Sequence, residues 1–158
     1  MLKRTTVGIC TFVLATIAMT NLSTAQTLKS AEQVQKALTV LNRVKDHTGR
    51  LVAAKNFAQL PHENMEFKEG VEALEKSLAG EPAAFRSKVD PLIKKAQDDS
   101  QHVTDAAATK DEAKVTANFA TMTESVKQVF AAFPANVQPS MPNRSQEKAE
   151  EKGGEGAK

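Results

Sequence analysis

Residues 109–134, with the sequence TKDEAKVTANFATMTESVKQVFAAFP, decide the fold of this chain. Apolar side chains recur there at every third or fourth position, at Val115, Phe119, Met122, Val126, Val129 and Phe133. This spacing places them on one face of an α-helix. Thr109 and Glu112 have the spacing of a capping box, and Pro134 is expected to end the helix. The stretch therefore predicts an amphipathic helix that buries one face against other helices.

A first helix is predicted from residue 30 to about residue 57. Ser30 and Gln33 have the spacing of a capping box. Apolar residues then recur with helical spacing at Val34, Leu38, Leu41, Val44, Leu51 and Val52. Gly49 weakens this helix without ending the pattern, and Leu60-Pro61 marks a break before the next one.

Two further helices are predicted before residue 109. The second carries a stripe formed by Phe67, Val71, Leu74 and Leu78, and Gly80 suits its C-terminal stop. Pro82 fits the first turn of the third helix. The stripe of that helix is Phe85, Val89, Leu92, Ala96, Val103 and Ala107. Pro91 lies inside this helix and is expected to kink it or to split it after Asp90.

The four helices together predict an all-α protein, an antiparallel up-down-up-down four-helix bundle over residues 26–137. Stripes that repeat close to every 3.5 residues favour helix crossing angles of about 20°. Short connections between consecutive helices favour antiparallel neighbours. Residues 138–158 hold prolines, glycines and mixed charges with little to bury, so they are predicted to form a disordered polar tail.

The first 25 residues have the pattern of a secretory signal peptide. Lys3 and Arg4 precede an uncharged apolar run over residues 7–19, and small or polar residues follow. The run is shorter than the roughly 20 residues that span a bilayer. Ser23 and Ala25 suit a cleavage site after Ala25. We therefore expect a cleaved signal peptide over residues 1–25, a periplasmic or secreted protein, and no membrane contact after cleavage.

The remaining composition excludes several classes of function. Cleavage would remove Cys10, the only cysteine, and would leave 19 basic and 19 acidic residues. A formally neutral chain lacks the concentrated basic surface that nucleic acids require. The chain has no Gly-x-Ser-x-Gly turn, no glycine-rich phosphate loop and no Glu-x-x-His pair of a di-iron bundle. We therefore expect neither nucleic-acid binding nor enzymatic activity.

The cluster His62-Glu-Asn-Met65 provides the candidate metal ligands, His62 and Met65. Imidazole and thioether ligands together suit copper, and His102 or Met122 would complete such a site. The alternative interpretation is that the histidines lie on the solvent-facing or boundary side of their helices.

Other polar and aromatic residues have simpler interpretations. Asp98, Asp99 and Asp105 are expected on a solvated helix face. Phe119, Phe130 and Phe133 are expected to pack in the core, although with Met122 they would also suit the lining of an apolar cavity at one end of the bundle.

Residues 106–133 resemble the last hairpin of the cytochrome c-prime group, which includes a soluble b-type cytochrome. The resemblance implies an exported antiparallel four-helix bundle. In c-prime members the final helix carries Cys-x-x-Cys-His followed by an aromatic residue. Here Val126-Lys127-Gln128-Val129-Phe130 occupies that motif, and Phe133 matches the trailing aromatic. A b-type site would need a Met on the first helix and a His near the end of the last, and this sequence has neither. We therefore expect no cofactor.

The leading hypothesis is an exported, non-enzymatic bundle resembling a haem-less cytochrome c-prime. It would bind an unknown protein or a small apolar ligand, or act as a structural module of the periplasm, and a homodimer is possible. Two alternatives stay open: a periplasmic copper-binding protein with His62 and Met65 as ligands, and a cytochrome-like protein with non-covalent haem.

Overall fold

A computed structural model describes residues 28–140 of the protein, and over that range it is all-helical with no strand. Its elements are α1 (Ala31–Ala53), η1 (Phe57–Gln59), α2 (Leu60–Ser77), α3 (Ala83–Ala108), α4 (Glu112–Ala131) and η2 (Ala135–Val137), where η marks a short 3-10 helix. The predicted all-α class and the four helices are confirmed. The predicted signal peptide over residues 1–25 lies outside the described residues, as does most of the predicted tail.

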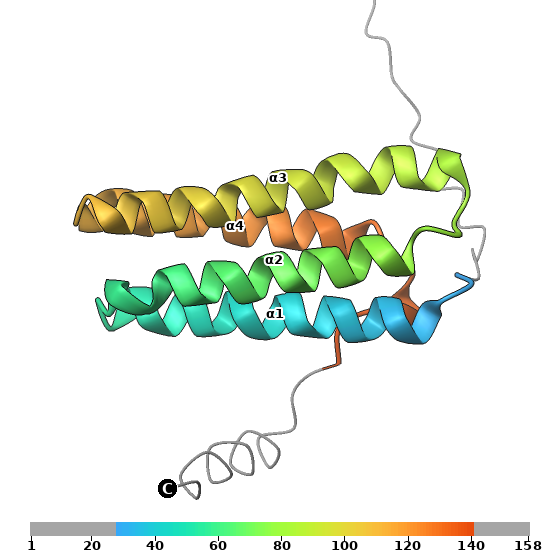
Figure 1. Cartoon of the computed structure of the whole chain (residues 1–158), viewed down its shortest axis with the longest axis horizontal. Helices are drawn as coiled ribbons and strands as arrows, with labels where there is room; N and C mark the ends of the chain where they lie inside the picture. The colour runs from blue at the N-terminus through green and yellow to red at the C-terminus, as the bar shows by residue number, and fades with distance from the viewer. Residues whose placement is uncertain (1–27, 141–158) are drawn as a thin grey trace, which may run out of the picture.

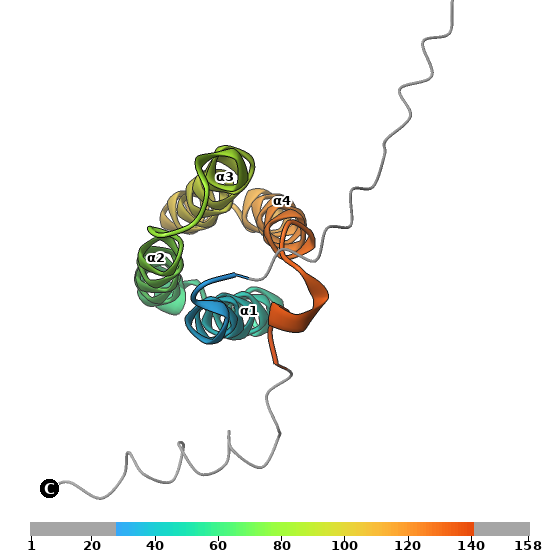
Figure 2. The same cartoon turned by 90° about the vertical axis from the view of Figure 1, so that its right-hand side faces the viewer.

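The four helices lie side by side in two closely packed pairs, α1 with α2 and α3 with α4 (Figure 1). Viewed along the bundle, each helix has two neighbours, and α1 also lies beside α4 (Figure 2). Consecutive helices are traced in opposite directions in Figure 1. The α1–α2 and α3–α4 connections therefore meet at one end of the bundle, on the left of that view.

One apolar core runs along the bundle, and every helix contributes to it. Its largest fully buried side chains are Phe67, Leu38, Leu41, Leu60, Leu74, Leu78, Ile93 and Met122. The predicted stripes are mostly buried, with a difference in α3. There Ile93 is buried and Leu92 is only partly buried. Leu92 and Ile93 both lie between Val89 and Ala96 at spacings of three and four, so helical spacing alone admits either residue at this position.

Two glycines permit close contact between helices. A β-carbon on Gly70 of α2 would lie 2.9 Å from a methyl group of Leu41 in α1. A β-carbon on Gly49 of α1 would lie 2.8 Å from the ring of Phe119 in α4. Because Leu41 is itself buried, the α1–α2 contact at Gly70 leaves little room for a larger residue.

The sequence misplaced several details of the helix ends. Helix α3 is not split, because it continues through Pro91 from Ala83 to Ala108. The predicted capping box at Thr109 is wrong: the N-cap of α4 is Asp111, whose side chain accepts a hydrogen bond from the Lys114 N–H at 3.0 Å. The Thr109 hydroxyl instead donates to the Ala106 carbonyl at the end of α3. Thr109 and Asp111 are thus two residues apart in the sequence, and Thr109 caps the end of α3 while Asp111 caps the start of α4.

Helices α1 and α2 also end before their predicted limits. Helix α1 ends at Ala53, and Phe57 belongs to η1. Helix α2 ends at Ser77, and Gly80 has no positive φ, so a left-handed glycine does not form its end. Ser30 is the N-cap of α1 as predicted, but its side chain makes no capping hydrogen bond.

The segment after α4 packs on the bundle further than predicted. The Gln138 side chain donates hydrogen bonds to the carbonyls of Phe130 and Phe133, both at 2.9 Å. Ser140 N donates to the Thr39 hydroxyl of α1 at 3.1 Å. The predicted start of the tail at residue 138 is therefore too early, because residues 138–140 cap α4 and contact α1. No helix within residues 28–140 is long and apolar enough to cross a membrane.

Candidate functional site

The predicted metal ligands His62 and Met65 lie near the start of α2 and face solvent. The His62 side chain is 63% exposed, and Met65 is 53% exposed. His62 Nε2 lies 3.1 Å from Glu66 Oε1, and Glu66 also pairs with Arg43 of α1 at 3.5 Å. Within the described chain, no three His, Cys, Asp or Glu side chains converge as a metal site would require. The two residues thus share one exposed helix surface, and Glu66 is the polar group beside them.

The two supplementary ligands of the copper hypothesis lie elsewhere in the bundle. Met122 is 1% exposed and belongs to the core of α4, away from the solvent-facing His62 and Met65. His102 lies on α3, and its side chain is 3.9 Å from Asp99 on the same helix. The structure therefore leaves His62 and Met65 without these two partners.

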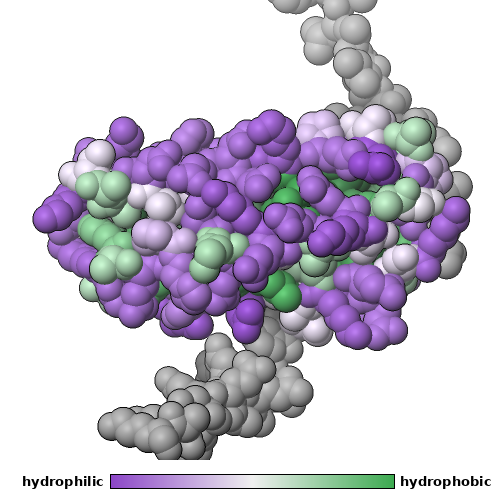
Figure 3. Space-filling model, in the orientation of Figure 1, coloured by the Kyte–Doolittle hydropathy of each residue, from purple (hydrophilic) through white to green (hydrophobic). Residues whose placement is uncertain are grey.

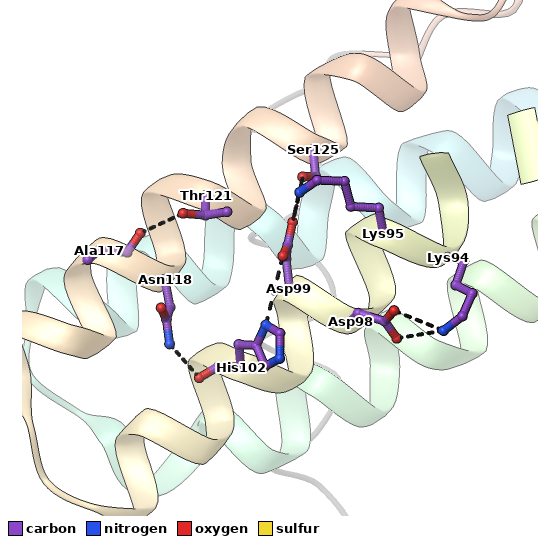
Figure 4. Close-up of polar contacts among 9 residues, drawn as sticks. All are labelled: Lys94, Lys95, Asp98, Asp99, His102, Ala117, Asn118, Thr121 and Ser125. Carbon is purple, nitrogen blue, oxygen red and sulfur yellow. Dashed lines mark hydrogen bonds and ion pairs between the residues drawn. The ribbon is translucent and has the colours of Figure 1, made fainter. Parts of the chain in front are cut away.

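A buried carboxylate links α3 to α4 (Figure 4). Asp99 Oδ2 accepts a hydrogen bond from the Ser125 hydroxyl at 2.5 Å and one from Lys95 Nζ at 2.7 Å. Lys95 Nζ also lies 2.8 Å from Ser125 Oγ. Asp99 is 8% exposed and Ser125 is 2% exposed, so the prediction of a solvated Asp99 is wrong. Asp98 is exposed as predicted and pairs with Lys94.

The electrostatics of this cluster favour an ionised Asp99. Burial raises the pKa of Asp99, but hydrogen bonds from Lys95 and Ser125, with the charges of Lys95 and His102, outweigh burial and lower the pKa below its ordinary value. The Ser125 hydroxyl donates directly to the carboxylate, and His102 is too distant for a hydrogen bond to Asp99. No imidazole lies between hydroxyl and carboxylate to act as a general base. The cluster is therefore an interhelical link.

Two comparable polar links involve α2. His47 Nδ1 of α1 lies 2.9 Å from Glu63 Oε1, and Glu63 is 3% exposed. The other carboxylate oxygen of Glu63 is buried without a hydrogen-bond partner. Between α2 and α3, the Ser100 hydroxyl donates to Asn64 Oδ1 at 2.9 Å. Each consecutive pair of helices thus shares a polar contact in which at least one partner is buried, and these three contacts use hydroxyl, amide, imidazole and carboxylate groups.

A hollow of about 600 Å³ lies where the α1–α2 and α3–α4 connections meet. Its apolar lining comes from Phe57, Ala58, Pro61, Ala107 and Ala108, and Asn56 and Thr104 add polar groups. Phe57 also packs against the core. In the space-filling view, hydrophobic surface shows at this end of a largely hydrophilic molecule, and further hydrophobic patches show along the middle and toward the opposite end (Figure 3). A concavity that combines apolar side chains with placed polar groups is a feature of small-molecule sites.

Three charged residues line the same hollow: Lys55, Lys110 and Glu112. Lys55 Nζ and Glu112 Oε2 form an ion pair of 2.6 Å, which joins the α1–α2 connection to the first turn of α4. Both partners are more than half exposed, so the pair itself contributes little stability. The Lys110 side chain has no ion pair or hydrogen bond within residues 28–140. The charge of the three groups sums to one positive charge.

The residues at the haem-attachment motif of the cytochrome resemblance do not fit a haem. Val126 and Val129 are both 1% exposed and belong to the packed core, while Lys127 and Gln128 are exposed. Phe133 is buried, with its ring 5.8 Å from that of Phe85 in an edge-on arrangement. None of these side chains is a thiol or an imidazole, the groups that the Cys-x-x-Cys-His motif would supply. The hollow at the α1–α2 and α3–α4 connections is not lined by the four residues predicted to suit an apolar cavity, Phe119, Phe130, Phe133 and Met122.

Sequence reasoning missed Asp99 and the two lysines of the hollow, although signals for them exist. Asp99 lies three residues after Ala96 and four before Val103, so helical spacing alone places it on the buried stripe. The two lysines occur in similar tetrapeptides, Ala53-Ala-Lys-Asn56 and Ala108-Thr-Lys-Asp111. Comparison of the chain with protein-family models, curated proteins and solved structures found no match. A functional proposal for this chain therefore rests on its own sequence and geometry.

Proposed function

We propose that the protein is an exported, non-enzymatic binding module that holds a small apolar ligand in the hollow at the α1–α2 and α3–α4 connections. The signal peptide over residues 1–25 is removed, which leaves an antiparallel up-down-up-down bundle in the periplasm or medium. The bundle is similar in fold to the cytochrome c-prime group but lacks haem. The observation that carries this proposal is the hollow itself, whose volume of about 600 Å³ lies within the range of about 300–1,000 Å³ found for small-ligand pockets.

The construction of the hollow supports a binding role. Its walls come from the two helix pairs: Phe57 and Pro61 from one, and Ala107 and Ala108 from the other. Helical and 3-10 backbone holds these side chains, so the apolar surface is available without prior rearrangement. A preformed pocket reduces the ordering that a ligand must otherwise impose. The small side chains of Ala107 and Ala108 leave the space that defines the hollow.

Binding is tested with N-phenyl-1-naphthylamine, an uncharged apolar fluorophore that brightens in apolar surroundings. Ala108→Leu fills the hollow from an exposed position at the end of α3. Ala84→Leu makes the same change at an exposed position in the first turn of α3 and serves as the matched control. We expect Ala108→Leu to weaken probe binding about tenfold, equivalent to about 1.4 kcal/mol, and Ala84→Leu to leave it unchanged. Equal binding by all three proteins would refute the proposed site.

The haem-less and exported parts of the proposal have their own measurement. The protein is purified after secretion, its N-terminus is sequenced and its visible spectrum is recorded. We expect an N-terminus at Gln26, which follows Ala25, and no haem absorption. A stoichiometric haem band would contradict the haem-less bundle, and a retained Met1 would contradict cleavage.

Copper binding is a second candidate, supported by a specific observation on α2. Met65 is the one large hydrophobic side chain that is exposed within residues 28–140, and it lies one turn from His62. An exposed thioether next to an imidazole suits Cu(I) or Ag(I). Titration of both ions against the wild type and the His62→Ala, Met65→Ala double variant tests this idea. We expect the double variant to lose the binding, whereas His102→Ala should keep it. Identical affinities for wild type and double variant would remove copper handling.

A further inference from the structure

The two lysines of the hollow share an unusual backbone conformation. Lys55 and Lys110 both have a φ of 56°, and within residues 28–140 they are the two non-glycine residues with positive φ. Residues other than glycine rarely adopt this left-handed backbone conformation, because their β-carbon crowds the following carbonyl. Both of these positions line one hollow, and they come from connections 55 residues apart in the sequence.

The backbone at both positions would accept glycine. Each lysine follows a helix C-cap, Ala54 or Thr109, at the position where glycine is the usual residue. The Lys55 N–H donates to the Val52 carbonyl at 3.1 Å, and the Lys110 N–H donates to the Ala107 carbonyl at 3.0 Å. Glycine would make the same two bonds without strain. The helix ends therefore do not require lysine, and the reason for lysine must lie in its side chain.

The charges of the hollow indicate what the side chain does. Glu112 neutralises Lys55 at 2.6 Å, while the Lys110 ammonium has no partner among the described residues. An unpaired cation beside an apolar lining complements a ligand with an apolar body and one negative charge. An ammonium–carboxylate hydrogen bond is charge-assisted and roughly twice as strong as a neutral one. Backbone strain retained at a site is a reason to infer function there.

We propose that the hollow binds a small amphipathic carboxylate, with its apolar part against Phe57 and Pro61 and its carboxylate at Lys110. Lys55, whose charge is neutralised by Glu112, lines the same hollow without adding net charge. This inference rests on the proposed ligand-binding function, and it adds the chemical class of the ligand. It also predicts that Lys110 makes the site bind anionic ligands more tightly than neutral ligands of the same size.

The test compares three ligands of equal chain length, octanoate, 1-octanol and octylamine, by calorimetric titration of the secreted protein. We expect octanoate to bind about tenfold more tightly than 1-octanol, with octylamine the weakest. The preference for octanoate should fall as salt is raised, because the lysine is solvent-accessible. Octanoate should also displace N-phenyl-1-naphthylamine from the hollow.

Substitutions at Lys110 separate charge from strain. Lys110→Gln removes the charge and keeps the strained backbone, so it should abolish the preference for octanoate without changing Tm. Lys110→Gly removes both, so it should abolish the preference and raise Tm. Lys110→Arg should keep the preference. Lys88→Gln, on an exposed lysine of α3 at a distance from the hollow, is the matched control and should change neither quantity.

Each outcome supports or overturns a specific claim. If naphthylamine binds but octanoate binds no better than 1-octanol, the carboxylate inference is overturned and the proposed ligand function stands. If neither naphthylamine nor octanoate binds, both are overturned. A preference for octanoate that survives Lys110→Gln overturns the role of Lys110, and a lower Tm in Lys110→Gly overturns the argument from strain.

Discussion

Replacement of Asp99 by asparagine should lower the free energy of unfolding by about 1–3 kcal/mol at neutral pH. Asp99 accepts two hydrogen bonds, from Ser125 at 2.5 Å and from Lys95 at 2.7 Å. A hydrogen bond to a charged group contributes about 1.5–3 kcal/mol, and the bond to buried Ser125 should approach this value. The Lys95 side chain is 51% exposed, so its bond is discounted to about 0–1 kcal/mol. Asparagine keeps the shape of the side chain and one hydrogen-bond acceptor, so part of the stabilisation from these two bonds is retained.

The same substitution should change the pH dependence of stability. The pKa of Asp99 is raised by burial but lowered overall by Lys95 and Ser125, so it lies below the ordinary value of 3.8. A carboxylate whose pKa is lower in the folded state stabilises the protein above its unfolded-state pKa. That contribution is lost as the pH falls below 3.8 and through the lower native value. The wild type should therefore lose stability on acidification faster than Asp99→Asn, and the two curves should converge.

Urea denaturation followed by far-UV circular dichroism measures both effects. Asp98→Asn is the matched control, because Asp98 is the neighbouring residue and pairs with Lys94 on the surface. We expect that control to change stability by less than about 0.5 kcal/mol. A double-mutant cycle with Ser125→Ala should give a coupling energy of about 1 kcal/mol or more. The reasoning is refuted if Asp99→Asn costs no more than Asp98→Asn, or if the cycle shows no coupling.

Three further substitutions test how the bundle is packed. His47→Ala should destabilise the protein by about 1–3 kcal/mol, measured by urea denaturation, because it leaves Glu63 buried without its partner; adding Glu63→Met should recover much of the loss. Gly70→Ala should cost roughly 1 kcal/mol in the same assay, as overpacking at α1 exceeds the gain in helix propensity, whereas Gly80→Ala should be neutral or slightly stabilising. Pro91→Ala should raise the free energy of unfolding by about 1–3 kcal/mol, since Pro91 removes a hydrogen bond inside α3; an unchanged midpoint would contradict this.

The sequence was sufficient for the helices because each one repeats its apolar residues over several turns. In α4 the predicted residues Val115, Met122, Val126 and Val129 are all buried. The exposed positions of His62 and His102 agree with the alternative interpretation of the histidines as surface residues. Local patterning decides these features, because a helix that buries one face has little freedom in which residues it buries.

The remaining features depend on contacts between segments that are distant in the sequence. Pro91 does not split α3, because tertiary packing on both sides of it maintains the helix. The hollow forms where two separate connections meet, so neither segment alone predicts it. The acidic side chain of Asp99 favours a solvated position, although its spacing from Ala96 and Val103 places it on the buried stripe. Its partner Ser125 lies 26 residues away, and together with Lys95 it supplies the hydrogen bonds that compensate burial.

The buried polar contacts explain how the bundle holds the hollow in place. They link each consecutive pair of helices: His47 with Glu63, Asn64 with Ser100, and Asp99 with Ser125. A shift of one helix by a turn would keep apolar side chains in the core but would leave these polar groups unpaired. An unpaired buried polar group costs about 1–3 kcal/mol, and a charged one costs more. The contacts therefore favour one register of the four helices. That register sets the position of the α1–α2 connection relative to the α3–α4 connection, and so the distance between the two strained lysines.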